Sequence, residues 1–226
     1  MKNIFATTLL LLAGILSLNA QTIVTSDQSV NEELSKWRIS ASAGGFYQIG
    51  RIPDGLSPEA LEHAKSLKWG VTYDVDATRY FHGTLGLGVK YNSVYTSHEQ
   101  SLPYSGEFSP SYLSDDINVW FLGPMISMRG FTKGWSNFIV NVGLGYMDYR
   151  DKATLCGRTI GVMGEAGYEL ALSKTVKLEA LFSFYGGRLS SVTQTWDGFE
   201  RRIQLGKDEE VSLGHLDLKI GLSFNF

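Results

Sequence analysis

The residues best suited to proton-transfer chemistry are His215 and Asp217, which stand two positions apart. In an extended strand, residues at i and i+2 point to the same face, so the Asp217 carboxylate could orient the His215 imidazole. Ser183 or Ser212 would then be the candidate nucleophile of an acyl-transfer enzyme. A histidine beside acidic residues on one face of a strand is more often a hydrogen-bond partner. We expect that role here, and no catalytic residues.

Other motifs also argue against common enzyme and binding classes. Cys156 is the only cysteine, which excludes an intramolecular disulfide and a cysteine-rich metal site. The glycine pair Gly143 and Gly145 lies within a predicted strand rather than at a strand-to-helix turn, so it does not predict a nucleotide site. The formal net charge is −3 and there is no basic stripe, which argues against nucleic-acid binding. We expect no cofactor and no metal.

The elements that must position these residues are strands with one apolar and one polar face. From residue 216 to residue 226, apolar and polar side chains alternate strictly. The apolar set is Leu216, Leu218, Ile220, Leu222, Phe224 and Phe226. A strand with one oily face fits a transmembrane β-barrel, whose outer wall faces lipid.

The same period of two recurs along the chain, and short turns alternate with long connections. The predicted strands are 37–49, 68–80, 84–92, 117–129, 138–146, 160–170, 176–185 and 216–226. No segment after the N-terminus reaches the roughly 18 uninterrupted apolar residues of a membrane helix. We therefore predict an all-β fold, an eight-stranded antiparallel up-and-down transmembrane β-barrel.

The fourth strand is the hardest to assign, because Val119, Phe121 and Met125 make its second face apolar too. We place the other set outward: Trp120, Leu122, Pro124, Ile126 and Met128. Aromatic residues then form a girdle at each end of the barrel. The turn-end girdle is Trp37, Phe81, Phe131, Trp135, Phe138 and Phe226, and the loop-end girdle is Tyr47, Trp69, Tyr95, Tyr146 and Phe184.

The inward faces of these strands hold charges of both signs in near balance. The predicted set is Arg38, Asp74, Asp76, Lys90, Arg129, Glu165, Glu169, Lys177, Glu179, His215, Asp217 and Lys219. An eight-stranded barrel is about filled by its own side chains, and unpaired buried charges are costly. We predict a paired polar network that plugs the lumen, rather than an open channel with a ring of one sign.

The N-terminal segment has the features of an export signal. Residues 1–20 hold one charge at Lys2, an apolar core and a small residue, Ala20, before the predicted cleavage site. We divide the chain into a signal peptide (1–20), a periplasmic lead-in (21–36) and a barrel (37–226), which predicts export to the outer membrane.

The long connections, at about 50–67, 97–115, 150–157 and 190–210, offer the candidate contact surfaces. Ser57 and Pro58 predict a short helix in the first loop. The segment 101–114, rich in aromatic and proline residues, is the better candidate for binding an extracellular partner.

The export signal, the strand Gly86–Tyr91 and the end of the chain, Gly221–Phe226, resemble the small outer-membrane β-barrel family common in Bacteroidota. The broader similarity is to OmpA/OmpX-type barrels without a periplasmic domain. The resemblance implies outer-membrane lipid around the barrel and insertion by the barrel assembly machinery, which reads the final strand. It supplies no shared catalytic residues.

We therefore expect a monomeric outer-membrane barrel with a structural or surface-interaction role. Two alternatives remain open: a lipid-modifying acyl hydrolase or transferase that uses His215, and a narrow pore. A third, a secreted soluble barrel of lipocalin type, would need the apolar faces to point inward.

Overall fold

A computed structural model describes residues 35–50, 52, 55–81, 83–101, 112–131, 136–151, 155–196, 199–206 and 211–226. The predicted signal peptide, the lead-in up to residue 34 and loop residues 102–111 lie outside the described residues. Within the described part, no helix has the length and hydrophobicity that a membrane crossing requires.

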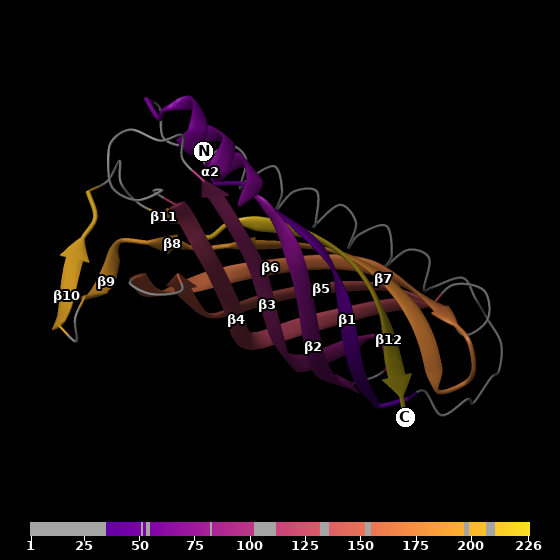
Figure 1. The fold of residues 1–226 in the computed structure, drawn as a ribbon. Coiled ribbons are helices and arrows are strands. Elements are labelled where there is room, and N and C mark those ends of the chain that lie inside the picture. The colour runs from indigo at the N-terminus through magenta and orange to yellow at the C-terminus, as the bar shows by residue number, and fades with distance from the viewer. Residues whose placement is uncertain are drawn as a thin grey trace, which may run out of the picture. The chain divides into compact units, whose positions relative to one another are not determined.

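Eight antiparallel strands close into a barrel (Figure 1), which confirms the predicted fold class. They are β1 (Trp37–Gln48), β2 (Trp69–Phe81), β3 (Leu85–Ser101), β4 (Tyr112–Phe131), β5 (Asn137–Asp151), β6 (Leu155–Ala171), β7 (Val176–Gly186) and β12 (His215–Asn225). Each strand pairs with its neighbour in sequence, and β1 pairs with β12 from Arg38↔Asn225 to Gln48↔His215. Closure leaves no unpaired edge in the barrel wall.

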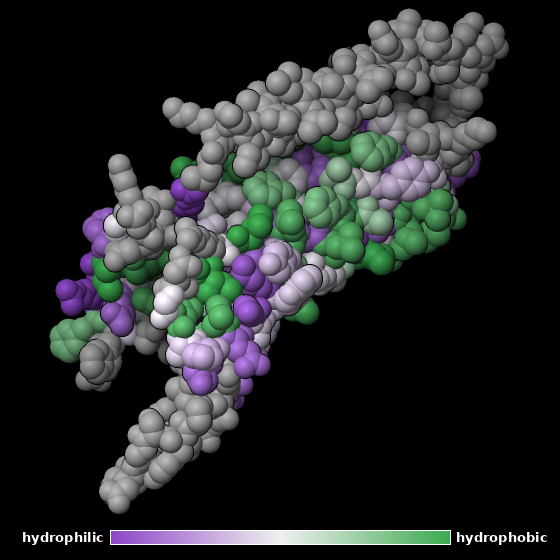
Figure 2. Space-filling view, turned by 90° about the horizontal axis from the view of Figure 1, so that it is seen from above, coloured by the Kyte–Doolittle hydropathy of each residue, from purple (hydrophilic) through white to green (hydrophobic). Residues whose placement is uncertain are grey.

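The strands have the predicted inside and outside faces. In β2 the alternation is strict, with Val71 57% exposed and Asp74 1% exposed. The outward assignment for β4 is also confirmed, because Phe121 and Met125 are buried while Leu122 and Ile126 are exposed. Figure 2 shows hydrophobic side chains gathered over the visible outer wall.

Several strands extend further than predicted. The predicted loop 97–115 holds the end of β3 and the start of β4, which pair as far as Ser101↔Tyr112. The predicted loop 150–157 is likewise shortened, because β5 reaches Asp151 and β6 begins at Leu155. The extension of β3 is polar on both faces and the other extensions add only a few residues of mixed character, so they lack the alternation that identified the rest of each strand.

The predicted polar loop 190–210 is also wrong in part, because it contains a β-hairpin. β9 (Ser191–Trp196) pairs with β10 (Phe199–Gln204). β9 also pairs with the start of β6 through Leu155↔Gln194 and Cys156↔Thr193. Two short strands, β8 (Arg188–Leu189) and β11 (Val211–Ser212), pair with each other. In Figure 1 the hairpin lies at the barrel end opposite the C-terminus.

The predicted helix in the first long connection is α2 (Pro58–Ser66). The Ser57 hydroxyl accepts a hydrogen bond from the Ala60 amide at 3.2 Å, as expected of an N-cap. The His63 ring is buried, and its Nε2 lies 2.9 Å from the Asp115 carboxylate on β4. The helix is therefore fixed to the β3–β4 extension.

Candidate functional site

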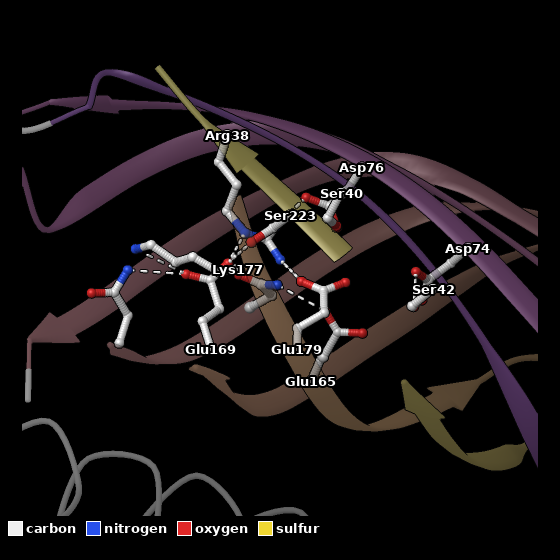
Figure 3. A network of polar contacts seen from close by, with 12 residues as sticks. Arg38, Ser40, Ser42, Asp74, Asp76, Glu165, Glu169, Lys177, Glu179 and Ser223 are labelled. Atoms are coloured by element: carbon white, nitrogen blue, oxygen red, sulfur yellow. Dashed lines mark hydrogen bonds and ion pairs between the residues drawn. The ribbon is translucent and has the colours of Figure 1, made fainter. Parts of the chain in front are cut away.

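The candidate site is the charged lumen, because all twelve residues of the predicted network are buried. Arg38, on β1 near the turn end, contacts three carboxylates (Figure 3). Its Nη1 donates to Asp76 at 2.5 Å, its Nε to Glu169 at 2.7 Å and its Nη2 to Glu179 at 2.5 Å. These carboxylates come from β2, β6 and β7, so one guanidinium links four strands across the lumen.

Two lysines form the next level of the network. Lys90 Nζ lies 2.8 Å from Glu165, 3.0 Å from Asp74 and 3.5 Å from Asp76. Lys219 Nζ contacts Asp74 and lies 3.1 Å from Glu165. Each lysine therefore shares two carboxylates with the other. Shared partners of opposite charge offset the desolvation that burial imposes on each ion.

The turn end holds the two remaining cations. Lys177 Nζ lies 3.6 Å from Glu169. Arg129 donates from Nε to the Gly83 carbonyl and from Nη2 to the Ser35 carbonyl, both at 2.5 Å, and its guanidinium lies 3.8 Å from the centre of the Tyr80 ring. The structure thus directs Arg129 to backbone carbonyls and an aromatic face at the barrel end.

Neutral polar side chains complete the network, and they were not among the twelve residues predicted for it. The hydroxyls of Ser40, Ser42 and Ser223 donate to Asp76, Asp74 and Glu169 at 2.5, 2.6 and 2.6 Å. The Asn141 amide donates to Glu165 at 2.8 Å. Like the charged residues, they occupy inward-facing positions in the strand alternation, and that position in the sequence identifies them as lumen residues.

His215 and Asp217 lie on one face, as predicted, but they are not hydrogen-bonded to each other. His215 Nδ1 lies 3.0 Å from the Leu213 carbonyl, while Nε2 is 3.7 Å from Asp217, beyond hydrogen-bond range. The ring stacks on Tyr185 with 4.8 Å between centroids. Ser183 donates to Glu165 at 2.6 Å, and Ser212 accepts from the Gly214 amide at 3.3 Å. The structure therefore brings neither serine into a bond with His215.

An apolar cluster fills the lumen on the loop side of these charges. Its most buried members are Phe121, Met147, Tyr185, Leu189 and Leu213. Inward glycines make space for it: a Cβ on Gly145 would lie 2.5 Å from Phe121 Cζ. The interior is thus divided into a charged half near the turns and an apolar half near the loops. Among the described residues, no group of three or more His, Cys, Asp or Glu is arranged to hold a metal.

Comparison with known structures supports the fold. The structure aligns with a major outer membrane protein of Thermus thermophilus (TM-score 0.53, 12% identity, 85% of this chain and 99% of that one). It also aligns with Neisserial surface protein A (TM-score 0.52, 13% identity, 84% and 97%) and with OprG of Pseudomonas aeruginosa (TM-score 0.52, 11% identity, 85% and 96%). Protein-family models and curated sequences give no match. The chain shares its fold with small outer-membrane β-barrels.

Proposed function

We propose that this protein is a monomeric integral outer-membrane barrel with a structural or surface-interaction role. The observation that supports it is that the arrangement of side chains is the reverse of that in a water-soluble protein. Large apolar residues lie on the outside, with Ile160 77%, Leu218 68% and Ile220 65% exposed, while the twelve residues of the lumen network are buried. Hydrocarbon is the solvent that favours such a surface, because exposed apolar area of this extent is unfavourable in water.

The finer parts of the proposal follow from this location. The signal peptide would direct export, and the outward ridge of β12, which includes Leu218 and Ile220, would be presented to the assembly machinery. Membership of the Bacteroidota family of small barrels belongs to the same proposal.

The surface role is supported by the loop end of the barrel. The β9–β10 hairpin exposes Phe199 (79%) together with Arg201 and Arg202, and β10 pairs on only one side among the described strands. An extended partner segment can add to such an edge through backbone hydrogen bonds. We propose that the hairpin, with the neighbouring loops, binds an extracellular partner.

The two alternative functions have less support. A pore needs a continuous hydrated path, whereas the lumen is filled by ion pairs in one half and by the Phe121 and Met147 cluster in the other. An acyl-transfer enzyme needs a serine bonded to its base, whereas the Ser183 hydroxyl donates to Glu165.

Purified protein in liposomes tests the proposal. We expect detergent-dependent extraction, a heat-dependent shift in gel mobility, no flux of small solutes and unchanged acyl chains on lipid A. A panel of host surface proteins and glycans is then screened with the intact protein and with a variant in which a short turn replaces residues 191–204. Binding that disappears in the variant supports the surface role, whereas solute flux or altered lipid A would contradict it.

A further inference from the structure

On β4, β5 and β6 the outer wall changes from apolar to polar between one row of outward-facing paired residues and the next. The row Leu122–Tyr146–Ile160 is apolar and exposed. The next two rows toward the loops are Trp120–Asp148–Arg158 and Asn118–Arg150–Cys156. The upper limit of the apolar belt on this side therefore falls at the level of Trp120 and Tyr146, whose rings lie 5.4 Å apart.

A buried carboxylate positions two arginines at this limit. Asp148 is only 2% exposed, although it occupies an outward-facing position in the alternation of β5. It accepts from Arg150 Nε at 2.8 Å through one oxygen and from Arg158 Nε at 3.2 Å through the other. The arginine side chains are 63% and 69% exposed. One negative charge thus holds two guanidinium groups, and the cluster keeps a net positive charge.

The carboxylate engages only one nitrogen of each guanidinium. Among the described residues, the terminal nitrogens of Arg150 and Arg158 make no hydrogen bond. The next outward acid on β4 is Asp116, which lies on the side away from the apolar belt. Paired N–H groups of this kind match the oxygens of a phosphate.

We propose that Arg150 and Arg158 bind the phosphate group of a membrane lipid whose acyl chains lie against Tyr146 and Ile160. The inference rests on the proposed membrane location and adds a specific ligand class to it. Cationic side chains at the level of the head groups attract anionic lipids. A lipid fits better than free phosphate, because the exposed apolar row directly below the arginines would contact the chains that the phosphate carries.

The test is native mass spectrometry of the full-length protein in detergent. The probes are lipid A with two phosphates, the same lipid dephosphorylated, and inorganic phosphate alone. We expect preferential retention of the phosphorylated lipid, a loss of about tenfold in affinity for each of Arg150→Gln and Arg158→Gln, and a larger loss in the double variant. Arg79→Gln is the matched control, since Arg79 is an exposed arginine near the turn end of β2, at the opposite end of the barrel, and this variant should bind lipid A as wild type does.

Three results would overturn the site: equal affinity of the double variant, equal retention of the dephosphorylated lipid, or inorganic phosphate binding as tightly as the lipid. A heat-shift gel on every variant shows that the barrel is folded, so lost binding is not lost structure. Failure of the membrane location is seen separately, as a folded protein that is soluble without detergent. A detergent-dependent barrel with no phosphate preference would refute the lipid site alone.

Discussion

Replacement of Arg38 by methionine would remove the cation that three buried carboxylates share. Asp76 would keep Lys90 at 3.5 Å and its bond from Ser40, and Glu169 would keep Lys177 at 3.6 Å and its bond from Ser223. Glu179 would keep no ion pair among the described residues, and its Oε1 already has no hydrogen-bond partner there. The main cost of Arg38→Met should therefore come from Glu179.

Removing one member of a buried ion pair typically costs about 3–5 kcal/mol, and we expect Arg38→Met to lower the free energy of unfolding by about that amount. The second change Glu179→Gln should restore part of the loss, with a coupling energy of about 1–3 kcal/mol. The assay is urea unfolding of the barrel in lipid vesicles, followed by tryptophan fluorescence. Arg201→Met, at an exposed site, should stay within about 0.5 kcal/mol of wild type.

A loss below about 1 kcal/mol for Arg38→Met would refute this reasoning, because it would match the value of a solvent-exposed pair. The lumen would then be hydrated enough to screen its charges. An absence of coupling between Arg38 and Glu179 would likewise show that the short contact between them does not determine the stability of this half of the barrel.

Three further substitutions test the outer wall and the apolar half of the lumen, each measured as a change in unfolding free energy in lipid. Leu218→Arg should cost about 2–4 kcal/mol if this 68% exposed side chain lies in mid-bilayer, and an equal cost in lipid-free detergent would contradict that placement. Phe121→Ala should cost about 3–5 kcal/mol, because it empties space in a packed cluster, and a loss under about 1 kcal/mol would mean that the cluster is loose. Gly145→Ala should cost about 1–3 kcal/mol, because the new methyl would meet Phe121 Cζ at 2.5 Å and the Leu122 carbonyl oxygen at 2.6 Å, and Phe121→Leu should relieve only the side-chain part of that cost.

The sequence predicts the barrel wall well because lipid and lumen impose opposite demands on alternate residues. In β12, and in β2 from Trp69 to Ala77, apolar side chains alternate with polar residues or glycine, so strand, face and approximate ends can be read directly. The same argument assigns Arg38, Lys90 and Lys219 to the interior. It cannot pair them, because Arg38 and Glu179 lie 141 positions apart and meet only through the register of the closed sheet.

Two parts of the structure lack that signal. Toward the loop end, both faces of β3 are polar, as at Ser97, His98 and Glu99, so strand and loop look alike in sequence. In the apolar half of the lumen, Phe121, Met147 and Met163 point inward and erase the alternation. Tight packing against inward glycines places these side chains, and pattern alone does not reveal that fit.

The attachment of β9 to the end of β6 gives the β9–β10 hairpin a stiff base. A peptide tag introduced between Trp196 and Phe199 would be held at a defined distance and direction from the barrel wall, in contrast to a tag on an unpaired loop. Because the hairpin is already ordered, it loses less conformational entropy when a protein binds to it than a flexible loop would lose. In the proposed orientation, with the loop end of the barrel outside the cell, this hairpin would therefore suit surface display.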